Sequence, residues 1–211
     1  MENFIILAKE FSVSMALVDF IPVIMFGIAC FILMKHFTKD MNKAQFALFS
    51  CGAIDVFVAG FLKATYKLLY AANICDFESL NKMFFTVQSI GFLLAGISMI
   101  WYVMKNKKTY LLQAPPIFSG TFLFVGFMCG GLLLLDTALC IIAKRMKKPW
   151  LIILFIVSFI SSLGMGYLSS KNFSEAAMNW IAEGVNILGQ GSLLAGVLLL
   201  NKARSNEINV E

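Results

Sequence analysis

The sequence predicts an all-α integral membrane protein, a single domain built as a bundle of six transmembrane helices. Apolar residues make up 60% of the 211 residues and charged residues 14%, whereas a soluble domain is about half apolar and about a quarter charged. The mean hydropathy is +0.84. The apolar residues also fall in runs of about 20 or more, which is the length that crosses a hydrocarbon core about 30 Å thick. The chain, residues 1–211, leaves no room for a second domain.

Six apolar runs give the predicted spans in chain order. They cover 13–36, 45–72, 81–104, 116–143, 149–170 and 177–200. The segment MENFIILAKEF before the first run lacks the basic region and cleavage site of a signal peptide, so we expect a short interfacial helix there. The fourth run is long and predicts one tilted helix. Pro115 and Pro116 prevent a continuous helix between the third and fourth spans.

Two stretches of similar sequence suggest an internal repeat. Residues 91–97 read GFLLAGI and residues 191–197 read GSLLAGV. They predict two repeats of three helices, residues 12–105 and 116–202, although two apolar helices can also match by chance. Because three is odd, the second unit would enter the membrane from the opposite face. The result would be an inverted repeat, which is common in secondary transporters.

The positive charges point to a membrane surface rather than to a nucleic acid. The net charge is +5, but Lys and Arg stand between the apolar runs instead of forming one basic face. They are placed to contact anionic lipid headgroups. If the spans alternate in direction and the N-terminus is cytoplasmic, slightly more of these charges lie on the cytoplasmic side. This weak bias favours a cell-membrane protein with both termini in the cytoplasm.

The last span carries the clearest polar pattern. Asn179, Glu183, Asn186 and Gln190 follow one another at intervals of 4, 3 and 4 residues, so they lie on one stripe of a helix. A carboxylate that faces lipid is costly, so we expect the stripe to face the bundle interior or a water-filled cavity. The alternative is that these groups only form hydrogen bonds between helices.

Polar residues also occur in the second and third spans. Asp55 and Lys63 are about 12 Å apart along the second helix and need partners on other spans. Lys63 either extends to the membrane surface or forms a buried ion pair. Lys67, nearer the helix end, is expected to extend to the surface. Gln88 in the third span is expected to bond to a neighbouring helix.

Two further acids lie in the first and fourth spans. Asp19 stands three residues before Pro22, where a kink would free backbone carbonyls that, with the carboxylate, can coordinate a cation. Alternatively, Asp19 caps the helix near the membrane surface. Asp136 is predicted to face the bundle interior. The acids outnumber the one deep base, Lys63, so the surplus must be protonated, bind a cation or face water.

Several classes of chemistry are missing from the sequence. The one histidine is His36, the five cysteines include no CxxC, and HExxH, GxSxG and Walker A motifs are absent. We therefore expect no cofactor and no metal site. An ATPase or a standard metallo- or serine hydrolase is disfavoured.

These observations favour a small membrane transporter, either a permease or a channel. It would move a small cationic or zwitterionic solute, with proton coupling. Gly91, Gly96, Gly191 and Gly196 would let helices slide. One alternative is a lipid-modifying enzyme with paired carboxylates such as Asp55 and Glu183. Another is an accessory subunit; any of the three can be a homo-oligomer. The predicted pathway consists of Glu183, Asn186, Gln190, Asp55, Gln88, Lys63, Asp19 and Asp136.

Overall fold

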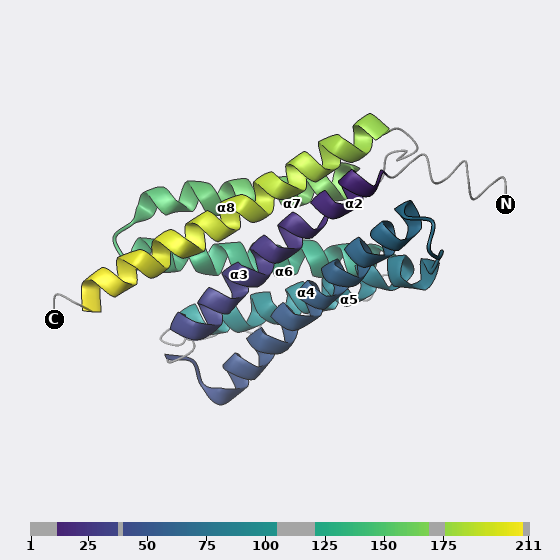
Figure 1. Ribbon diagram of the computed structural model, residues 1–211. Helices are drawn as coiled ribbons and strands as arrows, with labels where there is room; N and C mark the ends of the chain where they lie inside the picture. The colour runs from purple at the N-terminus through teal and green to yellow at the C-terminus, as the bar shows by residue number, and fades with distance from the viewer. Residues whose placement is uncertain (1–11, 38–39, 105–120, 169–175, 209–211) are drawn as a thin grey trace.

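The computed structural model describes residues 12–37, 40–104, 121–168 and 176–208, and over these ranges the chain is helical with no strand (Figure 1). The 3-10 turn η2 leads into α7. The predicted interfacial helix before residue 12 and the two prolines at 115 and 116 lie outside these ranges. The elements are α2 (Val13–Val18), α3 (Phe20–Phe37), α4 (Lys43–Ala71), α5 (Glu78–Met104), α6 (Thr121–Arg145), η2 (Pro149–Leu151), α7 (Ile152–Leu168) and α8 (Ala176–Ile208).

Among the described residues, five helices are long and apolar enough to cross a membrane, as expected of a multi-pass membrane protein. They agree with the first, second, third, fourth and sixth predicted spans. The fifth predicted span corresponds to a shorter apolar stretch, Pro149–Met165. The five long helices are Val13–Phe37, Lys43–Ala71, Ser79–Met104, Phe124–Arg145 and Ala177–Asn206.

The first span is interrupted at Asp19, which separates α2 from α3. Ser12 caps the start of α2, because its Oγ accepts a hydrogen bond from Met15 N at 3.2 Å. Pro22 has no N–H and cannot bond to the carbonyl of Val18 one turn earlier. The interruption therefore lies where the sequence predicts a kink, and it places the Asp19 side chain among the neighbouring helices.

The start of α4 is fixed by a reciprocal cap. Gln45 N donates to Asn42 Oδ1 at 2.8 Å, and Asn42 N donates to Gln45 Oε1 at 3.0 Å, so two backbone donors that lack helical partners are satisfied. The Ser98 hydroxyl of α5 donates to the Gln45 carbonyl at 2.6 Å. This bond sets the register of α4 against α5.

The helices form a closed ring in which each packs against two neighbours, in the order α3, α4, α5, α6, α7, α8 and back to α3. The largest buried apolar side chains, including Phe37, Phe49, Leu139, Phe155 and Leu200, form one core. They lie in the half of the bundle where α3, α5, α6 and α8 end. We call this half the apolar end, and the opposite half the cavity end.

Neighbouring helices α5 and α6 run in the same direction. An added Cβ at Gly131 would lie 2.4 Å from the backbone of Phe92, and one at Gly96 would lie 2.2 Å from Gly131 O. Further along both helices, Arg145 Nη2 donates to Val103 O at 2.5 Å. Higher numbers on α5 thus meet higher numbers on α6, as only parallel helices allow.

The parallel pair corrects the expected inverted repeat. Helices α3 to α5 and helices α6 to α8 follow the same sequence of directions, so neither unit is upside down relative to the other. The prediction assumed that the chain between the third and fourth spans turns back at one membrane face. Instead, Met104 and Thr121 lie at opposite ends of the bundle. Residues 105–120 can reach about 55 Å, which exceeds the length of α5 at about 40 Å.

The same directions separate the two ends of the described chain. Helix α2 begins at the cavity end, and α8 ends at the apolar end (Figure 1). The expectation that both termini share one side of the membrane rested on six alternating spans. It does not fit these helix directions.

Three of the four glycines expected to permit sliding are tightly packed instead. A Cβ at Gly91 would lie 2.8 Å from Gly52 O on α4, and one at Gly196 would lie 2.6 Å from the Phe155 ring. Gly96 contacts α6 as described above. Gly191 has more room, since the atom nearest to its added Cβ would be Met25 Sδ at 3.8 Å.

Gly131→Ala should destabilise the bundle, because its new methyl group would meet the backbone of Phe92, which cannot rotate away. We expect a loss of about 1–3 kcal/mol, seen as a lower melting temperature of the purified protein in detergent. Gly126→Ala on the same helix is the control, since nothing lies within 4 Å of its added Cβ. Equal melting of the two variants would contradict the close approach of α5 and α6.

Candidate functional site

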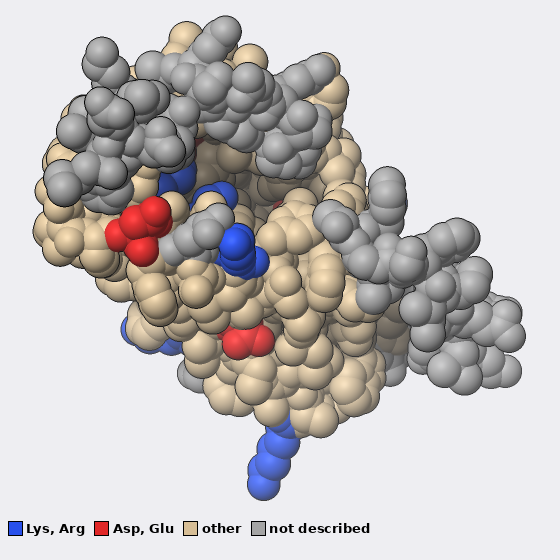
Figure 2. Space-filling model, turned by 90° about the vertical axis from the view of Figure 1, so that its right-hand side faces the viewer, with Lys and Arg blue, Asp and Glu red and all other residues tan. Residues whose placement is uncertain are grey.

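A cavity of about 180 Å³ opens inside the ring at the cavity end, and every helix from α3 to α8 contributes to its wall. Figure 2 views the molecule from this end and shows a hollow with Lys or Arg side chains along its edge. The polar lining residues are Asp19, Lys63, Lys67, Gln88, Ser162, Glu183, Asn186 and Gln190.

An ion pair links the first two spans at the cavity wall. Lys67 Nζ donates to Asp19 Oδ2, and the side chains are only 15% and 8% exposed. The carboxyl group of Glu183 on α8 also interacts with that of Asp19. The expectation that Lys67 extends to the membrane surface is therefore not met. Its spacing of four residues from Lys63, which puts both on one helix face, was the signal for a shared position.

Lys63 lies in the cavity without a carboxylate in contact. Its Nζ is 3.9 Å from the centroid of the Phe84 ring on α5, a distance at which the ring face attracts a cation. Within the described ranges, no carboxylate oxygen comes within the 4.0 Å of an ion pair to this ammonium. Its N–H donors thus remain available inside the cavity.

Two oxygens of the α8 stripe lack a hydrogen-bond donor. Glu183 Oε1 and Gln190 Oε1 are buried, and no donor among the described residues reaches them. A buried acceptor without a partner is unfavourable, so water or a bound molecule in the cavity is needed to satisfy them. Asn186 lines the cavity between them. Asn179, the first residue of the stripe, is buried but is not a lining residue.

The cavity is layered from its mouth to its floor. On the first span, Asp19 lies about 10 Å nearer the mouth than Phe26, because each helical residue advances about 1.5 Å. On α4, Lys67 and Lys63 likewise lie nearer the mouth than Val56. The charged groups therefore form a layer above an apolar floor, which Phe26, Val56, Phe57, Phe92 and Leu132 line.

The structure brings together most of the predicted pathway residues and leaves out two acids. Asp55 is half-buried and lies beside Gly91 at the contact of α4 with α5. Asp136 on α6 is 4% exposed, and neither of its carboxylate oxygens has a hydrogen-bond partner within the described ranges. Neither is a lining residue. The residues that do line the cavity are Glu183, Asn186, Gln190, Gln88, Lys63 and Asp19.

The part of the chain that the structure describes holds no group of three or more His, Cys, Asp or Glu that could bind a metal ion. Asp136, Cys129 and Cys140, which share a helix face, therefore do not form such a group. The cavity is lined by charged groups, amides and aromatic rings.

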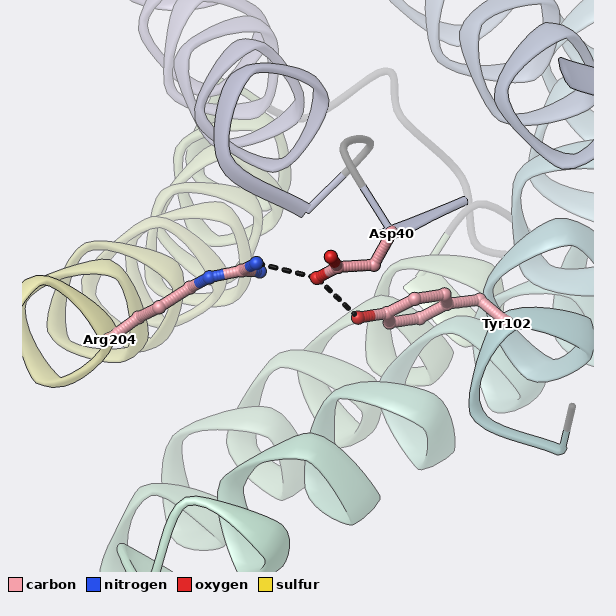
Figure 3. A network of polar contacts seen from close by, with 3 residues as sticks. All are labelled: Asp40, Tyr102 and Arg204. Atoms are coloured by element: carbon pink, nitrogen blue, oxygen red, sulfur yellow. Dashed lines mark hydrogen bonds and ion pairs between the residues drawn. The ribbon is translucent and has the colours of Figure 1, made fainter. Parts of the chain in front are cut away.

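A second polar network lies at the apolar end (Figure 3). Arg204 Nη2 on α8 donates to Asp40 Oδ2 at 2.5 Å, and the Tyr102 hydroxyl on α5 donates to the same oxygen at 3.5 Å. Arg204 also lies 4.9 Å from the centroid of the Phe37 ring. The network ties the α3–α4 turn to the ends of α5 and α8. Asp40 is 53% exposed, and such exposed pairs contribute at most about 1 kcal/mol.

The buried ion pair makes a prediction about stability. Lys67→Met should destabilise the protein more than Asp19→Asn does, because it leaves the carboxylates of Asp19 and Glu183 together with less positive charge. Loss of one partner of a buried pair costs about 3–5 kcal/mol. We expect the double variant to melt above Lys67→Met in thermal unfolding of the purified protein. Additive losses in the double variant would show that the two side chains do not interact.

No family model matches the chain, and neither a curated protein nor a solved structure is significantly similar to it. A function for this protein must therefore be argued from the cavity, its charges and its position in the bundle.

Proposed function

We propose that the protein is a cell-membrane transporter of a small solute, with six membrane-spanning helices around a central binding cavity. One observation carries the proposal: a polar cavity within the helix ring reaches one end of the bundle, while a packed apolar core fills the other end. Binding sites enclosed by spans and reached from one side at a time are typical of secondary transporters. The cavity holds charged side chains from the first, second and last spans.

The length of the fifth span supports a count of six. Together η2 and α7 cover Pro149 to Leu168, which at about 1.5 Å per residue gives about 30 Å, the thickness of the hydrocarbon core. Helix α7 also lies within the ring, between α6 and α8. A helix that completes a ring of spans lies at the same depth as its neighbours.

The two ends of the bundle support a carrier rather than an open channel. The apolar core blocks a continuous path from the cavity to the far end. The polar link across that end, from Asp40 to Arg204, is exposed and therefore weak. A solute taken up at the cavity end can leave only if the apolar end opens, as alternating access requires.

The positive charges favour one orientation. Among the described residues outside the cavity, Lys82 lies at the cavity end, and many more Lys and Arg residues lie at the apolar end. The positive-inside rule therefore makes the apolar end cytoplasmic, so that the cavity opens to the outside. Those at the apolar end are Lys35, Lys43, Lys144, Arg145, Lys147, Lys148, Lys202 and Arg204.

A paired-carboxylate enzyme has less support. Asp55 and Glu183, the acids considered for such chemistry, do not share the cavity, because Asp55 is not a lining residue. The other acid in the cavity, Asp19, is held by Lys67.

The proposed orientation is tested by labelling single cysteines in intact cells. In a background without the five natural cysteines, Ser12→Cys should react with a membrane-impermeant maleimide, because α2 begins at the outer, cavity end. Ser205→Cys should react only after the membrane is permeabilised, since it lies on α8 at the cytoplasmic end. Both positions are exposed in the structure. Labelling of both from the same side would rule out the parallel arrangement of α5 and α6.

The transport function is tested with purified protein in liposomes that enclose a pH-sensitive dye. Under an imposed proton gradient, pools of amino acids, small amines and metal cations are added in turn. We expect one pool to drive proton movement, and Glu183→Gln to slow it at least about tenfold, because this variant removes from the cavity a carboxyl group that can ionise. Gly126→Ala is the matched control and should transport normally. No movement with any pool, from folded protein, would sink the transporter proposal.

A further inference from the structure

We propose that the cavity binds a zwitterion: an α-amino acid with an apolar side chain, held by Glu183 through its ammonium group and by Lys63 through its carboxylate. This inference rests on the proposed function for its biological meaning, since it names the substrate class of the same cavity. It follows from the groups in the cavity that lack partners, from the balance of charge, and from the apolar floor.

Among the described residues, the cavity offers one carboxyl oxygen without a donor and one ammonium group without a carboxylate partner. Glu183 Oε1 is buried and has no donor among the described residues, and the Glu183 side chain is only 3% exposed. Lys63 has the Phe84 ring against it but no carboxylate. An ammonium group satisfies the first and a carboxylate satisfies the second, and charge-assisted hydrogen bonds of this kind are the strong ones.

The balance of charge disfavours a simple ion. The charges of Asp19 and Lys67 already neutralise each other in their ion pair. Glu183, whose carboxyl group contacts that of Asp19, balances the charge of Lys63 when it is ionised. Both side chains line one small space. A bound cation would be attracted by Glu183 but repelled by Lys63, and a bound anion would be attracted by Lys63 but repelled by Glu183. A ligand that carries both charges avoids this repulsion.

The floor and the size describe the rest of the ligand. Beyond the charged layer lie Phe26, Phe92 and Leu132, so the part of the ligand that points inward is apolar. The volume of about 180 Å³ is below the roughly 300–1,000 Å³ of pockets for drug-sized ligands. These limits fit an amino acid with a branched aliphatic or similar side chain.

The closed ring of helices favours a dissolved amino acid over a lipid headgroup as the source of the paired charges. A phosphatidylethanolamine headgroup also joins an ammonium group to an anionic group. A lipid would have to enter between helices, yet each helix contacts both of its neighbours around the ring. The opening lies at the end of the bundle (Figure 2). A solute dissolved in water therefore has the direct route.

The inference is tested by calorimetric binding to purified protein in nanodiscs made of phosphatidylcholine only. Three probes of similar shape are compared: leucine, 3-methylbutylamine, which lacks the carboxylate, and 4-methylpentanoate, which lacks the ammonium group. We expect leucine to bind at least about tenfold more tightly than either, because each analogue leaves one charged group of the cavity without a partner. Equal binding of the amine, or of the acid, would overturn the inference, as would no binding of leucine to folded protein.

Two variants assign the groups. Lys63→Met should bind leucine and the amine alike, because it removes the carboxylate's partner. Glu183→Gln should bind leucine and 4-methylpentanoate alike, for the reciprocal reason. Lys202→Met removes an exposed lysine at the far end and should bind like the parent chain. If both cavity variants retain the parent's preference for leucine, the assignment fails.

Two further experiments distinguish an amino acid site from a lipid site, and the zwitterion proposal from the transporter proposal. Nanodiscs that contain phosphatidylethanolamine should leave leucine binding unchanged, and loss of binding there would assign the site to a lipid headgroup. Liposome transport distinguishes the two proposals. Leucine binding without transport of any solute would keep the zwitterion site and remove the transporter. Transport of a solute that lacks either the ammonium group or the carboxylate would support the transporter proposal and contradict the zwitterion site.

Discussion

The ion pair of Lys67 with Asp19 is the interaction on which the arrangement of the cavity end depends. An isolated charge within a membrane is costly, so charges on different spans must meet one another or meet water. This pair joins the first span to the second, and the interaction of Asp19 with Glu183 brings in the last span. The charges of three helices thus collect in one layer. The described residues of the opposite half pack as a largely apolar core, in which Asp136 is buried.

Close contacts between backbones divide the ring into a stiff part and a softer part. Gly52 meets Gly91 where α4 crosses α5, and Gly96 meets Gly131 where α5 lies along α6. Interfaces at which backbones touch leave little freedom to shift. Helix α3 contacts α4 through side chains instead, such as the Phe57 ring against Gly27. If the protein transports a solute as proposed, movement between open and closed states is therefore expected of α3 and α8. Of the polar network at the apolar end, Arg204 lies on α8 and Asp40 follows α3.

The sequence predicted features that depend on a single helix better than features that depend on contacts between helices. The length of the apolar runs predicted the five long apolar helices, and the spacing on the last of them placed Glu183, Asn186 and Gln190 on the face that reaches the cavity. The pairing of Lys67 could not be predicted in this way, because it depends on how deep Asp19 lies on another helix. The direction of α6 was also beyond reach, since a connection of that length can either turn back or pass along the bundle.

The parallel direction of α5 and α6 explains a feature of the sequence that alternating spans leave unexplained. With alternating spans, the basic segments after α3 and after α6 fall on opposite faces, and the charges are almost balanced. With the observed directions, Lys35, Arg145 and Lys202 all lie at one end, which gives the strong bias that orients most multi-pass proteins. The end with these charges is also the one that the weak Asp40–Arg204 pair closes. In the proposed transport cycle, a solute that draws α3 and α8 together at the charged layer would strain that pair, and binding at the cavity end would thereby favour opening of the apolar end.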